Sequence, residues 1–135
     1  MRTLVRAALA AACLAGATVS VITYVSEIRL QHGAAALARG HNAEGALREL
    51  RASDSPLNPN SQRSVLVAVA LFRAGRRSEA ERTLVVAARR EPENVQIWAS
   101  LAYLEFRLGH LAAARAAFAH ARQLEPQPHL PLPSF

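Results

Sequence analysis

This chain has little of what most enzymes and metal sites are built from. It contains one cysteine, Cys13, so a disulfide within the chain is excluded. No serine, histidine and acid are grouped by a motif, no glycine-rich phosphate loop follows a strand pattern, and no two of the 5 histidines have helical ligand spacing. The sequence therefore predicts a protein that is not an enzyme and that has no cofactor or metal site.

Lysine is absent, and aromatic residues make up only 5% of the chain, whereas 51% of the residues are hydrophobic. A core of this composition has to be built from alanine and leucine, which suits closely packed helices. All 16 basic residues are arginines, and the formal net charge is +6. Because the arginines are scattered and no groove-reading motif accompanies them, a basic nucleic-acid-associated helical module in the cytoplasm is only the alternative hypothesis.

Residues 1–26 have the pattern of a transmembrane anchor. Arg2 and Arg6 precede 20 uncharged residues, 7–26. At about 1.5 Å per residue, a helix of this length matches the hydrocarbon core of a bilayer, which is about 30 Å thick. The positive charge before the run favours an inside N-terminus and an extracytoplasmic position for the domain that follows.

Two other interpretations of this segment stay open. A signal peptide could be cleaved near Ala17, after the small residues Ala15 and Gly16, which would leave a secreted or periplasmic protein. A lipoprotein would instead use Cys13 after a very short apolar region.

The stretch from residue 98 to 126 has the most specific pattern in the chain. It follows the spacing W-x2-L-A-x6-G-x4-A-x3-F-x2-A-x4-P, with Trp98, Leu101, Ala102, Gly109, Ala114, Phe118, Ala121 and Pro126. This spacing predicts two amphipathic helices, with a left-handed turn at Gly109 and a stop at Pro126. Small residues let the two backbones approach, and Phe118 is expected to fill the space between them.

The pattern recurs twice upstream, with a period of about 34 residues. The nearer copy has Ser64 in place of the tryptophan, and the farther copy is less complete. The nearer set is Val67, Ala68, Leu71, Gly75, Ala80, Leu84, Ala87 and Pro92, and the farther set is Leu30, Ala34, Leu37, Ala46, Leu50 and Ser53. Helix–turn–helix units with this period resemble the tetratricopeptide repeat. The predicted fold class is therefore all-α.

The resemblance implies three helical pairs in a short right-handed superhelix over residues 27–126, divided as 27–60, 61–94 and 95–126. A proline-rich tail, 127–135, follows. The periodicity predicts helices over residues 43–52, 65–74, 78–90, 95–108 and 111–124, and Ser78 is the predicted N-cap of the helix that starts there.

Tetratricopeptide-repeat proteins are typically binding scaffolds whose first helices line a concave groove. The resemblance places in this groove Arg39, Val65, Val69, Phe72, Arg73, Ala99, Tyr103, Phe106 and Arg107. The three arginines recur once in every repeat. They either form one basic wall that faces an acidic protein or peptide partner, or they are solvated charges that complement the helix dipole near a C-terminus. The lysine–asparagine clamp of some family members is replaced here by apolar residues such as Val65 and Val69, which excludes that subclass.

Two features depart from the pattern. Glu105 stands where Leu37 and Leu71 stand in the earlier units. It is expected to be partly exposed, to pair with an arginine of a neighbouring helix or to lie near an interface. No polar capping helix follows residue 124, so the last helix is expected to be covered by the tail, by a partner or by a second copy. The resulting hypothesis is a membrane-tethered protein–protein interaction scaffold of a bacterial envelope assembly or biogenesis system.

Overall fold

The computed structural model describes residues 23–40, 42–53 and 61–125. They form a helical segment over 23–38 followed by α2 (Ala43–Ala52), α3 (Ser61–Arg73), α4 (Arg77–Arg90), α5 (Val95–Leu108) and α6 (Leu111–Leu124). No strand occurs among these residues. The prediction of an all-α fold is confirmed.

Local signals account for most helix ends. The side chain of Asn42 caps α2 by accepting from the backbone N–H of Gly45, and Asn94 caps α5 in the same way. Gly75 and Gly109 follow α3 and α5 with φ values of 79° and 83°, a conformation that glycine adopts at little cost. The bounds predicted for α2, α5 and α6 are those observed.

The predicted starts of α3 and α4 are wrong. Helix α3 begins at Ser61 rather than at Val65 and ends at Arg73. Helix α4 begins at Arg77, and its N-cap position is Arg76, which makes no side-chain capping hydrogen bond. Ser78 is inside the first turn. Arg76 instead forms an ion pair with Glu79. The carboxylate of Glu79 lies in the first turn, where a negative charge favours the N-terminus of a helix.

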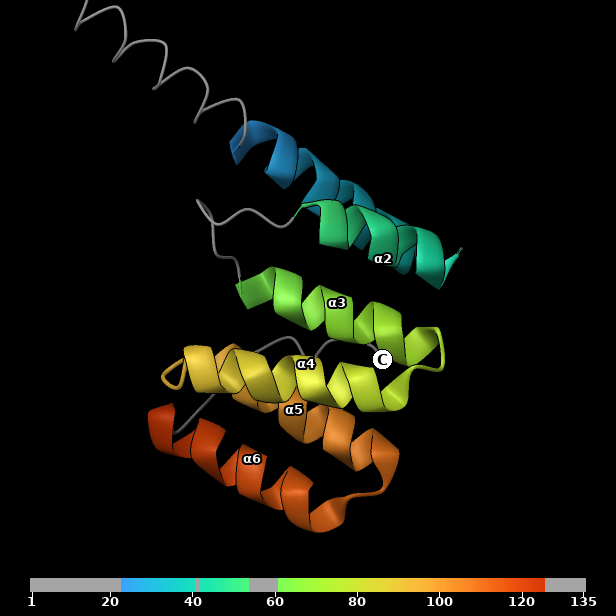
Figure 1. The fold of residues 1–135 in the computed structure, drawn as a ribbon. Helices are drawn as coiled ribbons and strands as arrows, with labels where there is room; N and C mark the ends of the chain where they lie inside the picture. The colour runs from blue at the N-terminus through green and yellow to red at the C-terminus, as the bar shows by residue number, and fades with distance from the viewer. Residues whose placement is uncertain (1–22, 41, 54–60, 126–135) are drawn as a thin grey trace, which may run out of the picture.

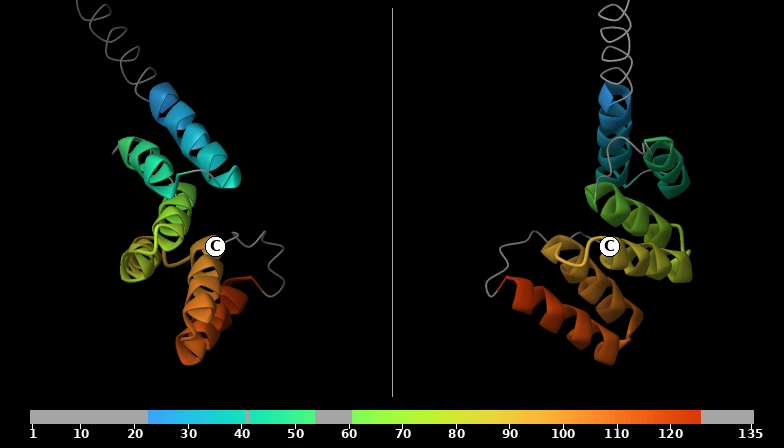
Figure 2. Two further views of the ribbon diagram at one scale, coloured as in Figure 1. Left: turned by 90° about the vertical axis from the view of Figure 1, so that its right-hand side faces the viewer. Right: turned by 60° about the vertical axis from the view of Figure 1, so that its left-hand side comes forward.

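The helices lie one after another in a stack that follows the order of the sequence (Figures 1 and 2). Within α2–α6 each helix contacts its neighbours in sequence, and α5 also contacts α3. Each interior helix is therefore covered on two sides. At the C-terminal end of the described chain, α6 is covered by α5 alone.

Leucine and alanine form the core, as the composition predicts. One buried cluster extends from Leu30 to Ala117, and its most buried large side chains include Leu47, Leu50, Leu84 and Leu104. Burying such a side chain stabilises the fold by about 1.5–3 kcal/mol. The larger Trp98 is only half-buried, and its indole N–H donates to the carbonyl of Pro92 at 2.8 Å.

Close packing also joins the segment 23–38 to α2. Gly33 is buried, and a Cβ atom there would lie 2.7 Å from Cγ of Leu50. Leu50 is itself fully buried, so it has little room to move. Glycine at this position lets the two helices approach.

No helix of the described residues is long and apolar enough to span a bilayer. Most of the predicted anchor, residues 1–22, lies outside the part of the chain that the structure describes. Cys13, the predicted cleavage point near Ala17 and the tail 127–135 lie outside it as well.

Candidate functional site

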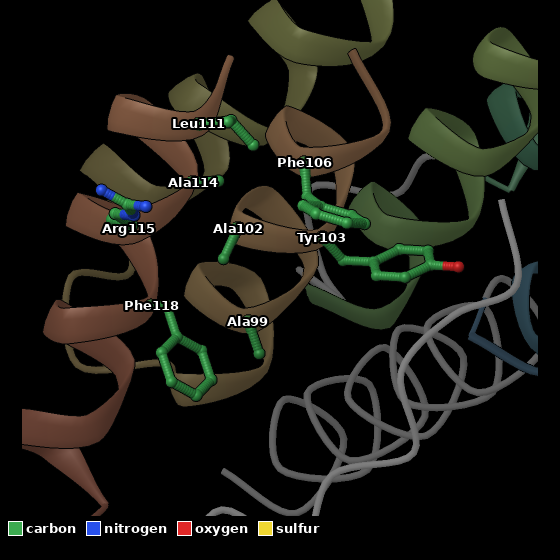
Figure 3. A pocket seen from close by; sticks show the side chains of 8 residues that line it. All are labelled: Ala99, Ala102, Tyr103, Phe106, Leu111, Ala114, Arg115 and Phe118. Carbon is green, nitrogen blue, oxygen red and sulfur yellow. The ribbon is translucent and has the colours of Figure 1, made fainter. Parts of the chain in front are cut away.

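An apolar hollow lies at the end of the stack, between α5 and α6 (Figure 3). We call it the terminal groove. Its volume is about 360 Å³, and it is lined by Ala99, Ala102, Tyr103, Phe106, Leu111, Ala114, Arg115 and Phe118. The α5 residues form one wall and the α6 residues the other.

Three large apolar side chains are exposed in the terminal groove. Phe106 is 60% exposed, Leu111 52% and Phe118 50%. The expectation that Phe118 fills the core is therefore wrong. The side chain stands on the face of α6 that no described helix covers. The buried side chains of α6 are the small Ala114, Ala117 and Ala121, and His120 packs against Trp98 of α5.

The equivalent positions of the preceding repeat form a corresponding surface between α3 and α4. We call it the internal groove: Val65, Ala68, Val69, Phe72, Arg77, Ala80, Glu81 and Leu84. Here α5 packs against both helices, and Leu84 is fully buried in a cluster with Leu101 and Leu104 of α5. The two grooves thus have equivalent positions, and only the internal one is covered.

Polar residues differ between the two grooves. Glu81 of the internal groove becomes Arg115, and the exposed Arg77 becomes Leu111. Arg115 makes no hydrogen bond or ion pair with any described residue. In α5 and α6 the single acidic residue is Glu105, which is buried. The exposed charges of these two helices are therefore all positive.

The structure divides the residues that the sequence assigns to the binding groove. Tyr103 and Phe106 line the terminal groove together with Ala99, which is nearly buried. Val65 and Val69 lie in the core beneath α5 and present almost no surface to a partner. Sequence reasoning did not assign Leu111, Arg115 or Phe118 to a binding surface, although it did note that no polar capping helix follows residue 124.

The arginines of the predicted basic wall contact the protein itself. Nη1 of Arg73 donates to the carbonyl of Leu37, at the end of the preceding segment. The guanidinium of Arg107 lies 5.5 Å from the ring centre of Phe72 and 6.0 Å from that of Tyr103, distances that allow cation–π attraction. Arg39 is exposed near the end of its helix. Arg73 thus connects α3 to the segment 23–38, and Arg107 connects α5 to α3.

Glu105 is 5% exposed, so the expectation of partial exposure is wrong. Its Oε2 lies 2.7 Å from Nδ1 of His110, and no arginine of the described chain pairs with it. The partner comes from the turn after Gly109, which bends the chain back toward the end of α5. A buried carboxylate needs such a hydrogen bond, because leaving it unpaired would be costly.

A third ligand-type atom, from Glu81, lies near this pair. The ligand atoms of Glu81, Glu105 and His110 are all within 4.8 Å of one another. Two ligands of one tetrahedral zinc ion, each about 2.0–2.1 Å from it, would be about 3.3 Å apart. The 2.7 Å between Glu105 and His110 is the length of a hydrogen bond.

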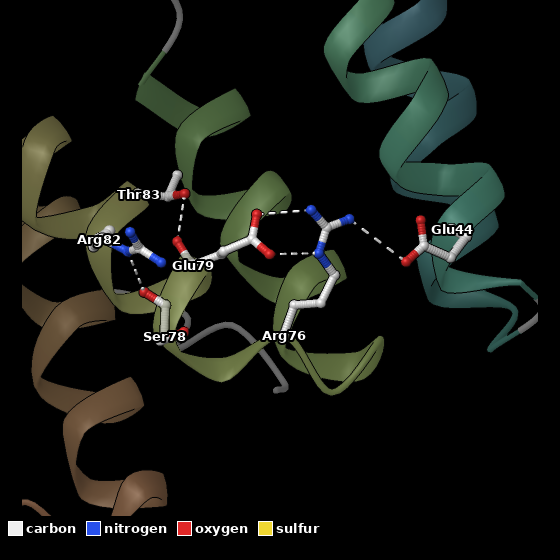
Figure 4. A network of polar contacts seen from close by, with 6 residues as sticks. All are labelled: Glu44, Arg76, Ser78, Glu79, Arg82 and Thr83. Atoms are coloured by element: carbon white, nitrogen blue, oxygen red, sulfur yellow. Dashed lines mark hydrogen bonds and ion pairs between the residues drawn. The ribbon is translucent and has the colours of Figure 1, made fainter.

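A charged network joins α2 to the start of α4 (Figure 4). Arg76 donates two hydrogen bonds to Glu79, both 2.7 Å long, and lies 3.6 Å from Glu44 of α2. The hydrogen bonds from Arg76 hold the pKa of Glu79 below its usual value, and those to Glu79 raise the pKa of Arg76. All three side chains are open to solvent, so this network positions the turn rather than forming a reactive site.

A second, more polar hollow lies over α3 and α4. Arginines surround it, and its lining is Arg63, Ser64, Arg82, Thr83, Val86, Ala87, Arg90 and Glu91. It contains no aromatic side chain on which a base could stack. Its charge suits an anion, but two of its arginines already donate to backbone carbonyls, Arg63 to Ser53 and Arg82 to Ser78.

Comparison with known proteins assigns no family: the sequence matches no protein-family model and no curated protein.

Proposed function

We propose that this protein is a protein-binding helical repeat module of the tetratricopeptide type, and that the terminal groove is its recognition surface. The observation that carries the proposal is the exposure of Phe106, Leu111 and Phe118 around one apolar hollow. Aromatic side chains in an apolar pocket are the usual anchors of protein interfaces, since binding energy concentrates in a few buried residues.

The repeat assignment rests on positions rather than on composition. Alanines one repeat apart, such as Ala80 and Ala114, are both buried against the preceding helix. The turn glycines Gly75 and Gly109, which are separated by the same interval, have nearly the same φ. In the proposed architecture, three such pairs form a short right-handed superhelix.

The proposed setting is a membrane surface. Residues 1–26 would anchor the protein with its N-terminus inside, and the helical domain would recruit a partner for an envelope assembly or biogenesis system. Alkaline carbonate extraction tests the anchor: the full-length protein should stay with the membranes, and a protein without residues 1–26 should be released. A mature form that begins near Thr18 would show a signal peptide instead.

Site-specific photocrosslinking tests the binding function. The photoreactive p-benzoylphenylalanine replaces Phe106 in the full-length protein, and the exposed Arg89 serves as the control site on α4. A specific adduct is expected from position 106 and not from position 89. The captured protein should then bind the purified chain directly. It should bind the Phe106→Ala variant less tightly. Identical adducts from both positions, or none, would refute the proposal.

The second candidate is nucleic-acid binding by the polar hollow of Arg63, Arg82 and Arg90. That function requires a cytoplasmic domain and an affinity that falls steeply with salt. An unchanged electrophoretic mobility of nucleic acid at low salt would exclude it.

A further inference from the structure

We propose that the occupant of the terminal groove is an amphipathic α-helix of a partner protein that places a carboxylate beside Arg115. This inference rests on the protein-binding function proposed above and specifies the chemistry of the partner.

The helical form of the occupant follows from the internal groove. Its positions correspond one to one with those of the terminal groove in the next repeat, and its occupant is the helix α5. The alanines that let α5 approach, Ala68 and Ala80, have alanine counterparts at 102 and 114. Phe118 and Leu111 add apolar surface where the internal groove has Leu84 and Arg77. The terminal groove is therefore shaped for a helix and is the more apolar of the two.

The carboxylate follows from the substitution of Glu81 by Arg115. In the internal groove the carboxylate of Glu81 lies within 4.8 Å of ligand atoms of Glu105 and His110, which belong to the occupant and its turn. A partner helix that binds the terminal groove as α5 binds the internal groove has one residue that corresponds to Glu105. That residue would lie next to Arg115. Arg115 has no ion pair within the described chain, and a carboxylate there would satisfy its planar donor group.

The same charges argue against a second copy. An α5–α6 face placed against its copy would bring Arg107, Arg115 and Arg122 toward the same three arginines. Stacking head to tail would place Arg29, which stands two repeats before Ile97, against this positive end. The tail 126–135 offers no acidic residue at all. A partner of opposite charge fits the groove better than any part of this chain that could reach it.

The probe is a synthetic peptide with the sequence of residues 94–109, the natural occupant of the internal groove. Ala99→Lys and Tyr103→Asp are joined by a lactam bridge, and Phe106→Gln improves solubility. These three positions line the terminal groove in the protein, so the bridge lies on the side of the helix away from the binding contact. The bridge keeps the probe helical whether or not it binds.

Fluorescence anisotropy of the labelled peptide with full-length protein gives the affinity. Phe118→Glu should weaken binding about tenfold or more, because it puts a charge at the apolar centre of the contact. Arg115→Glu should weaken binding of the peptide by a few-fold. A peptide that carries Glu105→Arg should bind the Arg115→Glu protein better than it binds the unsubstituted protein. Arg89→Glu is the matched control: it makes the same charge change on the exposed surface of α4, outside the groove, and should leave the affinity unchanged.

Three outcomes would overturn the inference. The first is that the helical peptide does not bind. The second is that Arg89→Glu weakens binding as much as Arg115→Glu does. The third is that the charge exchange gives no recovery of binding. A dimer in sedimentation experiments that Phe118→Glu dissociates would also overturn it, since the occupant would then be a second copy. Failure of these tests alongside a specific adduct from position 106 would leave the protein-binding function standing and refute only the helical, acidic partner.

Discussion

The internal and terminal grooves have equivalent positions and different surroundings. Leu84 is fully buried because α5 lies over it, whereas Phe118, at the same place in the next repeat, is 50% exposed. Leucine and phenylalanine are both large hydrophobic residues, so residue type does not explain the difference in exposure. What differs is the presence of a neighbouring helix, so an exposed apolar surface arises here from the end of a stack.

The polar residues of the two grooves differ in a second way. The internal groove carries Glu81 close to the buried Glu105–His110 pair, and the terminal groove carries Arg115 with no partner in the described chain. A groove that is open leaves its charge available for a ligand, which is why Arg115 carries the inference about the partner.

The largest expected effect separates the grooves by stability. Leu84→Ala should lower the free energy of unfolding by about 2–5 kcal/mol, because it leaves a cavity under α5. Phe118→Ala should lower it by at most about 1 kcal/mol, although the side chain removed is larger. Urea unfolding followed by circular dichroism measures both. Equal losses would mean that the terminal groove is covered in solution.

A smaller effect is expected at the turn after α5. His110→Ala should cost about 1–3 kcal/mol, because Glu105 would be buried without its hydrogen bond. Adding Glu105→Leu, which restores the residue type found at Leu37 and Leu71, should recover most of that loss. Chemical unfolding of the single and double variants decides the matter. A His110→Ala protein as stable as the unsubstituted one would show that water replaces the imidazole.

The smallest effect is expected at the turn before α4, where Arg76 stands at the position that corresponds to His110. The hydrogen bonds from Arg76 lower the pKa of Glu79 from an ordinary value of 4.5. A lowered folded-state pKa contributes stability above the unfolded-state pKa, and this contribution is lost as the pH falls through the folded-state value. Stability should therefore fall below about pH 4.5, and less steeply in Glu79→Gln. Matching pH profiles of the two proteins would contradict the role of this pair.

Sequence reasoning succeeded where the causes are local. Apolar spacing and glycine turns give the bounds of α2, α5 and α6, because helix periodicity and left-handed caps depend on residues within one or two turns. The start of α4 was missed because Ser78 looks like a cap, whereas the ion pair of Arg76 with Glu79 places the cap two residues earlier. The residue at which α4 begins therefore depends on whether Ser78 or Arg76 occupies the N-cap position.

The candidate site was found only in part. Tyr103 and Phe106 were identified from their place on the first helix of the pair, but Val65 and Val69 share that place and are buried. Phe118 was assigned to the core because its sequence position matches Leu84. Periodicity identifies the apolar face of a helix and does not say whether another helix covers it.

An all-helical chain and the places of its turns can be read from the amino-acid sequence. These features follow from spacing, from glycine and from proline, all of which act on the local backbone. Three others emerge only once the helices are packed: Glu105 is buried against His110, Arg73 and Arg107 connect neighbouring helices, and the exposed apolar side chains of α5 and α6 surround one hollow. Burial and pairing depend on which distant segments come together, and that is fixed by packing rather than by any local pattern.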